Sequence, residues 1–197
     1  MRGVYDIIAK PLGSRYNNSK SIGDKNLILN TEVFNHQYIN REAEVTEVPV
    51  VNSLNLSKGD IVVLHHNVFR RWHDVKGREK NSRSYLKEDE YFVQPNQVFL
   101  TKSPSEDWSC VSGYCFVQPI KDTDSLSAEA ERPLMGVVKY SDGTVPVGSL
   151  VGFTPGDEFE FIVDGQRMYR VMSKFITIKY EYQGDEEEYN PGWADSR

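Results

Sequence analysis

The feature that most constrains the fold is a glycine–aspartate corner that leads directly into a run of apolar residues. Residues 56–66 read Leu-Ser-Lys-Gly-Asp-Ile-Val-Val-Leu-His-His, so a turn signal at residues 57–60 precedes four apolar positions. Three of these four are β-branched, which is typical of a buried strand entered through a tight turn. The same device recurs within residues 153–161, where Gly156 and Asp157 precede Glu-Phe-Glu-Phe. The pattern predicts a chain built twice from one plan.

Further strand-like segments follow the same order in both halves, with Gly, Pro and Asp between them and no helical periodicity. The predicted correspondences are 7–12 with 114–120 (Pro11 with Pro119), 42–51 with 135–140, Gly59-Asp60 with Gly156-Asp157, 91–93 with 169–171, and 98–102 with 175–180. The first half is longer between its first and second strands and again after its Gly-Asp strand. A duplication with two insertions therefore explains the pattern, and the predicted fold class is all-β, with two tandem small β-barrels.

The predicted domains follow from these segments. Residues 1–104 form the first barrel, with a long mobile loop at 13–34 and a basic loop at 67–87. The loop at 13–34 is rich in Asn, Ser, Gly and Lys, so it buries too little apolar surface to offset the entropy of ordering it. Residues 113–183 form a second, degenerate barrel, and residues 184–197 form an acidic, flexible tail.

Composition narrows the class of protein. A length of 197 residues fits one or two domains, and a net charge of −6 argues against a general nucleic-acid binder. No apolar run approaches 18 residues, and the N-terminal sequence lacks the apolar core of a signal peptide. Cys110 and Cys115 match no common zinc or redox spacing. We expect a soluble, cytoplasmic protein with reduced thiols and no membrane partner.

The order of features in residues 3–102 resembles the GroES-type co-chaperonin family, the lids of chaperonin rings. A strand ending in Lys10-Pro11 precedes a polar loop with an aliphatic tripeptide, a Glu-Val strand, the Lys-Gly-Asp-Ile-Val-Val corner, a roof-like loop, and Tyr-Phe-Val and Val-Phe-Leu strands. The resemblance implies small Greek-key-like barrels that form homo-oligomeric rings and dock on a GroEL-type chaperonin without a cofactor of their own. The more basic second loop, the second half and the acidic tail depart from the family and resemble virus-encoded versions.

The tripeptide Leu27-Ile28-Leu29 has two interpretations. It is either a short strand with ordinary core contacts, or a segment that docks in a groove on a partner. The resemblance implies the second, with Leu27, Ile28 and Leu29 as the chaperonin-binding residues. The polar loop before the tripeptide favours the same interpretation, because an apolar anchor on a flexible tether can reach a partner.

The basic segment 67–87 also has two interpretations. It is either a solvated loop or a contact surface, with Arg70, Arg71, Trp72 and Arg78 as candidates for contacts with nucleic acid or with an acidic neighbour in an assembly. His73 belongs to the same run. We expect weak or no nucleic-acid binding at physiological salt.

Metal and catalytic sites are not expected. His65, His66 and His73 suggest a metal site, but adjacent residues of a strand point to opposite faces, so His65 and His66 would not both face one ion without a bulge. No Cys or carboxylate cluster completes such a site, although Asp74 is near. Ser109-Cys110 has no base nearby in the sequence, and no Gly-x-Ser-x-Gly or phosphate-binding glycine loop occurs. The chain is therefore expected to be neither a metalloprotein nor an enzyme.

The resemblance implies a co-chaperonin-like lid that caps a chaperonin ring and assists protein folding, in the cytoplasm of a host if the protein is virus-encoded. The alternative is a structural or assembly protein of a bacteriophage virion, built on the same barrel and in contact with other virion proteins. A third hypothesis is a nucleic-acid-associated protein that acts through the basic loop.

Overall fold

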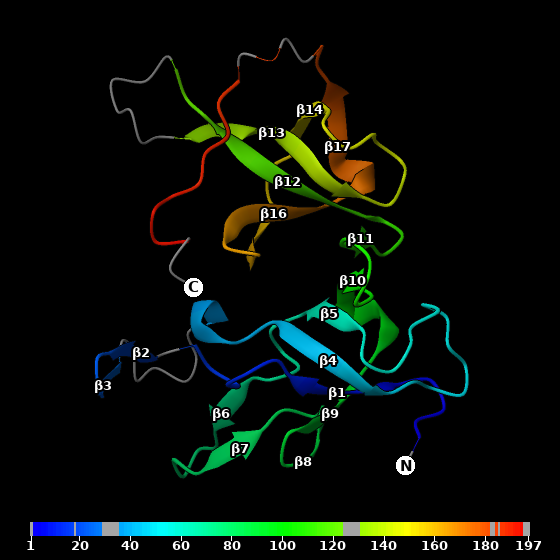
Figure 1. The fold of residues 1–197 in the computed structure, drawn as a ribbon, viewed down its shortest axis with the longest axis vertical. Coiled ribbons are helices and arrows are strands. Elements are labelled where there is room, and N and C mark those ends of the chain that lie inside the picture. The colour runs from blue at the N-terminus through cyan, green and yellow to red at the C-terminus, as the bar shows by residue number, and fades with distance from the viewer. Residues whose placement is uncertain are drawn as a thin grey trace. The chain divides into compact units, whose positions relative to one another are not determined.

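The computed structural model describes residues 2–17, 19–28, 36–123, 131–181, 184 and 186–194 (Figure 1). The chain divides into two compact units, Met1–Trp108 and Ser109–Arg197. The first contains β1 (Ile7–Pro11), β2 (Ser19–Ile22), β3 (Lys25–Ile28), η1 (His36–Tyr38), β4 (Glu42–Glu47), β5 (Ile61–Leu64), β6 (Arg71–His73), β7 (Glu79–Asn81), β8 (Tyr85–Lys87), β9 (Glu90–Val93), η2 (Pro95–Gln97) and β10 (Val98–Lys102). The second contains β11 (Ser109–Cys110), β12 (Tyr114–Lys121), β13 (Glu131–Ser141), β14 (Leu150–Phe153), β15 (Phe159–Val163), β16 (Gln166–Met172), η3 (Ser173–Phe175) and β17 (Ile176–Lys179).

The predicted all-β class is confirmed, because antiparallel strands and three short 3-10 turns make up the regular structure of the described residues. None of these turns, nor any other described helix, has the length and apolar character needed to cross a membrane. In each large sheet the described strand order begins and ends on different strands. Both are therefore open sheets by their hydrogen bonds, and the closure of each unit into a barrel stays a prediction.

In the first unit the large sheet contains the order β10-β5-β4-β1-β9-β8 (Figure 1). The Gly-Asp corner sets the entry to β5: Gly59 has a positive φ of 93°, which a glycine adopts without strain. The Ser57 backbone N–H donates to the Asp60 carboxylate at 2.7 Å, and the Val45 N–H donates to the Asp60 carbonyl at 2.8 Å. These bonds hold the corner against β4, and the chain enters β5 directly after it. The largest fully buried side chains here are Phe69, Ile7, Ile8, Leu64, Leu100, Val45, Val62, Val63 and Val68.

The second unit repeats this order strand for strand. Its sheet runs β17-β14-β13-β12-β16-β15, so each strand has a counterpart in the first unit. The register is repeated as well, because a register shift precedes both Ala9 in β1 and Val117 in β12 where these strands pair with β4 and β13. The equivalent paired residues are Ala9 and Val117, Pro11 and Pro119, Val45 and Val138, and Tyr91 and Tyr169. Shared order and shared register support an internal duplication.

One predicted correspondence is wrong. The counterpart of the Gly59-Asp60 corner is Gly148-Ser149, where the Gly148 N–H donates to the Val138 carbonyl at 2.8 Å and the Val138 N–H donates to the Ser149 carbonyl at 2.9 Å. Gly148 has a positive φ of 82°, as the turn requires. The Gly156-Asp157 pair instead precedes β15, the counterpart of β8. The shared Gly-Asp dipeptide led to the wrong correspondence, because the corner is defined by its backbone hydrogen bonds to the neighbouring strand and not by the aspartate.

Part of the acidic segment 184–197 is bonded to the second unit, and the flexibility of this segment stays a prediction. The Lys121 N–H donates to the Glu187 carbonyl at 2.8 Å, and the Tyr189 N–H donates to the Pro119 carbonyl at 2.8 Å. An ion pair joins Lys139 and Glu188 at 2.6 Å. Glu187 and Glu188 therefore have basic partners, Lys121 on β12 and Lys139 on β13.

Candidate functional site: the two inserted hairpins

The two units differ most at two links. Thirty residues, 12–41, join β1 to β4 in the first unit, whereas the equivalent link between β12 and β13 has nine, 122–130. Twenty residues, 65–84, join β5 to β8, and their equivalent, 154–158, has five. The first long link carries the hairpin β2–β3 and the second carries the hairpin β6–β7, where a loop was expected. Because the second unit forms the same sheet without these additions, the two inserted hairpins are candidates for a functional role.

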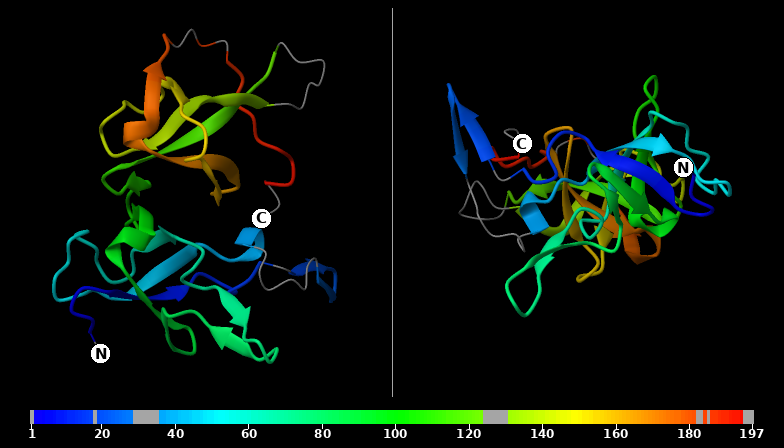
Figure 2. Two further views of the ribbon diagram at one scale, coloured as in Figure 1. Left: turned by 180° about the vertical axis from the view of Figure 1, so that it is seen from behind. Right: turned by 90° about the horizontal axis from the view of Figure 1, so that it is seen from below.

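The hairpin β2–β3 projects from the first unit and carries the predicted docking residues (Figures 1 and 2). Leu27 lies opposite Lys20, and Ile28 lies opposite Ser19. Leu27 is 52% exposed and Ile28 is 63% exposed. Neighbouring strand residues point to opposite faces, so neither face of β3 is packed into the core. The pair lies in a strand, and both side chains are more than half exposed; Leu29 lies outside the described residues.

The base of this hairpin is fixed to the sheet. Tyr16 forms a bridge with Ile39, and the Asn40 N–H donates to the Arg15 carbonyl at 3.1 Å. The Asn40 side chain is buried, and its amide donates to the Leu12 carbonyl at 2.8 Å and to the Ser14 carbonyl at 2.9 Å. Residues 14–16, at the start of the predicted loop 13–34, are therefore anchored, and the hairpin β2–β3 follows them.

The second hairpin, β6–β7, is closed by Asp74. Its carboxylate accepts from the backbone N–H groups of Lys76 and Arg78, both at 2.9 Å. These bonds, with the Arg78 bond first, hold the pKa of the Asp74 carboxyl below its usual value. Gly77 completes the turn with a φ of 72°. Each strand of this hairpin has three residues, and five of the six are polar or charged. The sequence therefore lacks the apolar alternation by which a strand is recognised.

Arg15 joins the two inserted links. Its Nε donates to the Phe69 carbonyl at 2.5 Å, its Nη1 to Asn81 Oδ1 at 2.6 Å, and its Nη2 to the Arg70 carbonyl at 3.1 Å. Its guanidinium also lies 5.2 Å from the centre of the Tyr91 ring. Burial lowers the pKa of Arg15, yet a guanidinium stays charged under ordinary conditions. One side chain therefore holds both ends of β6–β7 against the base of the first link.

Tyr16 makes a second connection between the same two links. The Arg71 N–H donates to Tyr16 Oη at 2.7 Å, and the Arg71 guanidinium lies 4.6 Å from the centre of the Tyr16 ring. Arg71 also pairs with Glu79 at 3.1 Å. This candidate contact residue is thus engaged within the protein.

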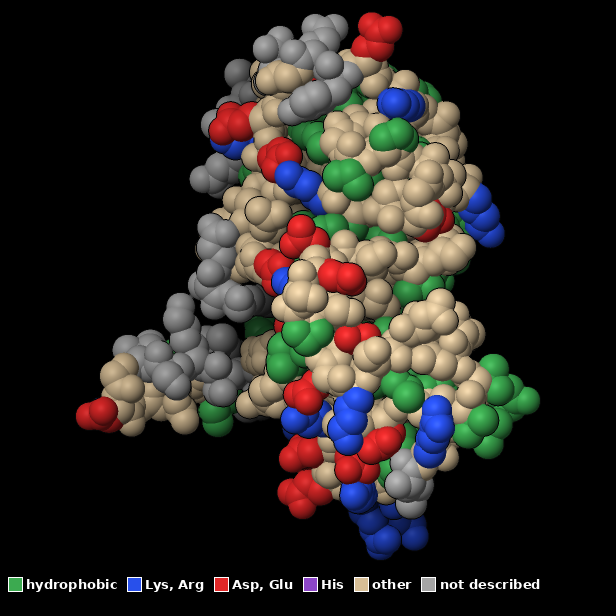
Figure 3. Space-filling model, turned by 45° about the vertical axis from the view of Figure 1, so that its right-hand side comes forward, with side chains coloured by type: hydrophobic (Ala, Val, Ile, Leu, Met, Phe, Trp, Pro, Cys, Tyr) green, Lys and Arg blue, Asp and Glu red, His purple; other side chains and the backbone are tan. Residues whose placement is uncertain are grey.

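The other basic candidates are placed differently. Arg78 is exposed on the turn, whereas Arg70 and Trp72 line a cavity of about 540 Å³ at the base of the hairpin. Arg83, which the sequence did not single out, lines the same cavity. Figure 3 shows Lys and Arg side chains over the lower margin of the first unit, at the level where Figure 1 places β7 and β8. Arg70 and Trp72 therefore share one cavity, whose lining does not include Arg71 or Arg78.

Three of the four histidines, His36, His65 and His66, have rings that lie close together, and the prediction that His65 and His66 point to opposite faces of a strand is wrong. Strand β5 ends at Leu64, so both lie in the following turn, with ring centres 4.3 Å apart. His36 lies 5.4 Å from His66. Burial, followed by the charges of His65 and Arg41, lowers the pKa of His66 to about 3. No group of three metal-binding side chains in the described part of the chain is arranged as a site.

In the second unit, Cys110 is not poised as a nucleophile. Burial raises the pKa of its thiol far above the usual value, so the reactive thiolate is disfavoured. Cys115 is buried among Val117, Val138 and Val171. Both cysteines are unbridged.

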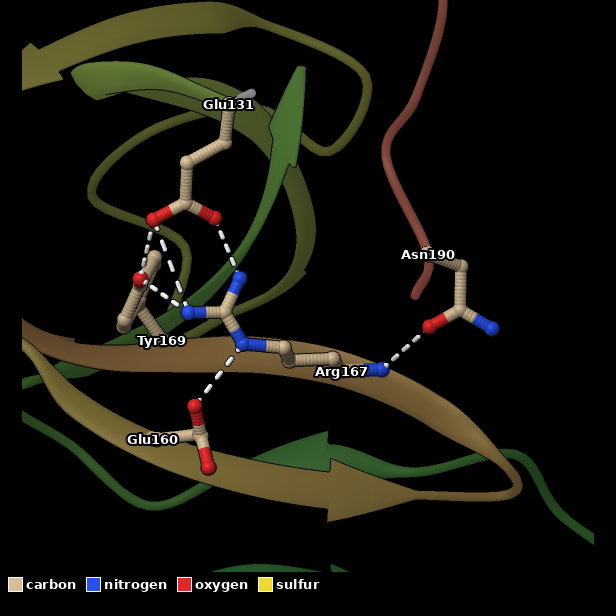
Figure 4. A network of polar contacts seen from close by, with 5 residues as sticks. All are labelled: Glu131, Glu160, Arg167, Tyr169 and Asn190. Atoms are coloured by element: carbon tan, nitrogen blue, oxygen red, sulfur yellow. Dashed lines mark hydrogen bonds and ion pairs between the residues drawn. The ribbon is translucent and has the colours of Figure 1, made fainter. Parts of the chain in front are cut away.

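A polar network of the second unit links β13, β15, β16 and the tail (Figure 4). Arg167 donates to Glu160 at 2.8 Å, to Tyr169 Oη at 2.5 Å and to Glu131. Burial alone would lower the pKa of Arg167, but the bonds to Glu131 and Glu160 raise it. Burial and the bond to Glu131 raise the pKa of Tyr169. Asn190 accepts from the Arg167 backbone N–H at 2.9 Å, so the network also fastens the tail.

Comparison with known proteins assigns no family. No protein-family model matches the chain, and no curated protein matches it significantly.

Proposed function

We propose that this protein is a co-chaperonin-like lid that caps a GroEL-type chaperonin ring and assists protein folding, with the β2–β3 hairpin as its docking segment. In this proposal each unit is a GroES-like barrel and several copies form a ring in the cytoplasm. The lid needs no cofactor, because nucleotide hydrolysis belongs to the chaperonin. The observation that carries the proposal is the exposure of Leu27 and Ile28 on a projecting hairpin that interrupts an otherwise repeated frame.

The energetics favour this use of the hairpin over a role in the core. Burial of one aliphatic side chain contributes about 1.5–3 kcal/mol, and a two-stranded hairpin without a packed face is marginally stable. Leu27 and Ile28 are each more than half exposed, so a partner's groove would gain about 2–3 kcal/mol from the pair. Exposed aliphatic residues at this position contribute little to the fold but supply an anchor for a partner.

One hairpin alone would bind a chaperonin weakly, so tight binding requires several copies in one assembly. Fixing a flexible residue costs about 1–2 kcal/mol, so ordering even two residues of the docking hairpin on binding offsets the gain from the apolar pair. Several hairpins on one ring act at high effective concentration and bind tightly without new contacts. The proposal therefore includes a homo-oligomer.

The test is co-sedimentation with a chaperonin and nucleotide for Leu27→Ser, Ile28→Ser and Leu29→Ser. Val75→Ser is the matched control, because Val75 is fully exposed on the other hairpin. We expect the three variants to fold and assemble as wild type does but to lose chaperonin association, while Val75→Ser retains it. Variants that unfold would show that the tripeptide is core. A wild-type protein that folds but binds no chaperonin would refute the lid and favour the virion structural protein.

A further inference from the structure

The cavity at the base of β6–β7 has the chemistry of a nucleotide site. Its lining includes Arg70, Trp72, Ser82, Arg83, Ser84 and Gln97. Its volume of about 540 Å³ lies in the range of small-molecule sites. The residues come from before β6, from β6 itself, from the segment between β7 and β8, and from η2. Four stretches of the first unit therefore converge on one concave surface.

The positive charge of the cavity lining favours an anionic ligand. The lining carries two guanidinium groups and no carboxylate. The carboxylates of the adjoining hairpin have other partners, since Asp74 accepts from the backbone of its own turn and Glu79 pairs with Arg71. Arginine is suited to phosphate, because its planar fork of N–H donors matches the phosphate oxygens.

Trp72 supplies a stacking surface held in place at one edge. Its indole Nε1 donates to the Asn81 carbonyl at 3.2 Å, and it lies opposite Lys80 in the hairpin ladder. The side chain is nevertheless 44% exposed. An aromatic ring that is fixed by its polar edge and open on part of its surface is the kind of platform on which a base stacks.

The remaining groups suit the polar edge of a base or a sugar. Ser82 Oγ donates to the Val68 carbonyl at 2.6 Å, which leaves the hydroxyl oxygen able to accept. Gln97 Oε1 accepts from the Gln94 N–H at 3.0 Å, which leaves its NH₂ group to donate. The cavity thus offers a donor and an acceptor beside the aromatic surface.

From these features we propose that the cavity binds a nucleotide unit, with the base stacked on Trp72 and the phosphate held by Arg70 and Arg83. A free mononucleotide and a nucleotide within a single strand share this chemistry. The site is distinct from the docking segment on β3, and the two proposals can fail separately.

The test is calorimetric titration of the full chain with adenosine monophosphate, adenosine, inorganic phosphate and a short oligothymidylate. We expect the mononucleotide to bind at least tenfold more tightly than adenosine or phosphate alone, because only the nucleotide uses both halves of the site. Binding that is tighter for the oligonucleotide, and that weakens steeply with salt, would identify a single strand as the source. Stronger binding of the mononucleotide would identify the free nucleotide.

Variants locate the site. Trp72→Leu and Arg83→Gln should each weaken nucleotide binding about tenfold, whereas Trp72→Phe should preserve most of it. Arg78→Gln is the matched control, since Arg78 lies on the same hairpin outside the cavity lining. Leu27→Ser should leave nucleotide binding unchanged. The proposal is overturned if neither nucleotide binds at millimolar concentration, or if Arg78→Gln weakens binding as much as Arg83→Gln does.

Discussion

Replacing Arg15 with Met should release the two inserted hairpins from each other. Arg15 donates three hydrogen bonds, at 2.5, 2.6 and 3.1 Å, to acceptors near both ends of β6–β7. Bonds from a charged donor contribute about 1.5–3 kcal/mol each when fully protected. The bond to Asn81 is exposed and the other two are partly buried, so the sum must be reduced. We expect Arg15→Met to lower the free energy of unfolding of the first unit by about 2–4 kcal/mol.

The assay for Arg15 combines urea denaturation with hydrogen exchange. The Arg71 N–H, which donates to Tyr16 Oη, should lose protection first, together with the ladder of β6–β7. Backbone amides of β1 and β4 should stay protected, because their pairing does not involve Arg15. Arg78→Met removes an equal charge from an exposed turn position and should change stability by no more than about 0.5 kcal/mol. An Arg15→Met protein as stable as Arg78→Met, with normal protection at Arg71, would refute the role of Arg15.

Three further predictions concern stability. Arg167→Met leaves Glu131 and Glu160 without their shared cation, so it should lower the unfolding free energy of the second unit by about 2–4 kcal/mol in urea denaturation. Arg132 is exposed, so Arg132→Met should change this free energy little. Equal stabilities of the two variants would contradict the prediction. The folded-state pKa of His66 is about 3, below the unfolded value near 6.5, so the unfolded state binds a proton first and stability falls as pH drops from 6.5 towards 3. Between pH 6.5 and 5, His66→Gln should reduce the fall in unfolding free energy by about 1 kcal/mol, after allowance for the partial exposure of His66. If His66→Gln and His73→Gln have identical pH profiles, burial of His66 is not responsible for the fall. Leu27→Ser and Ile28→Ser should each change the unfolding free energy by no more than about 0.5 kcal/mol, and a loss above 2 kcal/mol would place the pair in the core.

The repeated frame was predictable because apolar alternation and turn residues mark it directly. The strand predicted after the Gly-Asp corner is β5, with the same bounds, and the segments at 91–93 and 169–171 lie in β9 and β16 at equivalent register positions. Strand β14 was missed, because its corner, Gly148-Ser149, lacks the aspartate of the first copy. The positive φ of Gly148 is a backbone property that the sequence signals only weakly.

The candidate site was predictable only in part. The exposed residues Leu27 and Ile28 were singled out because an aliphatic tripeptide stands out in a polar segment. The connection through Arg15 joins residues 54 and 66 positions apart, and no local pattern encodes it. Arg83 was overlooked for the same reason, since its place in the cavity depends on how the hairpin returns to β8. Short strands of charged residues also hid the hairpin β6–β7 itself.

Native mass spectrometry of the protein with and without a chaperonin tests the central proposal most directly. The lid predicts a homo-oligomer that joins a chaperonin ring as one assembly in the presence of nucleotide, and that Leu27→Ser and Ile28→Ser oligomers fail to join. Val75→Ser oligomers should join as wild type does. A folded protein that stays monomeric, or a homo-oligomer that never joins a chaperonin under these conditions, would contradict the proposal.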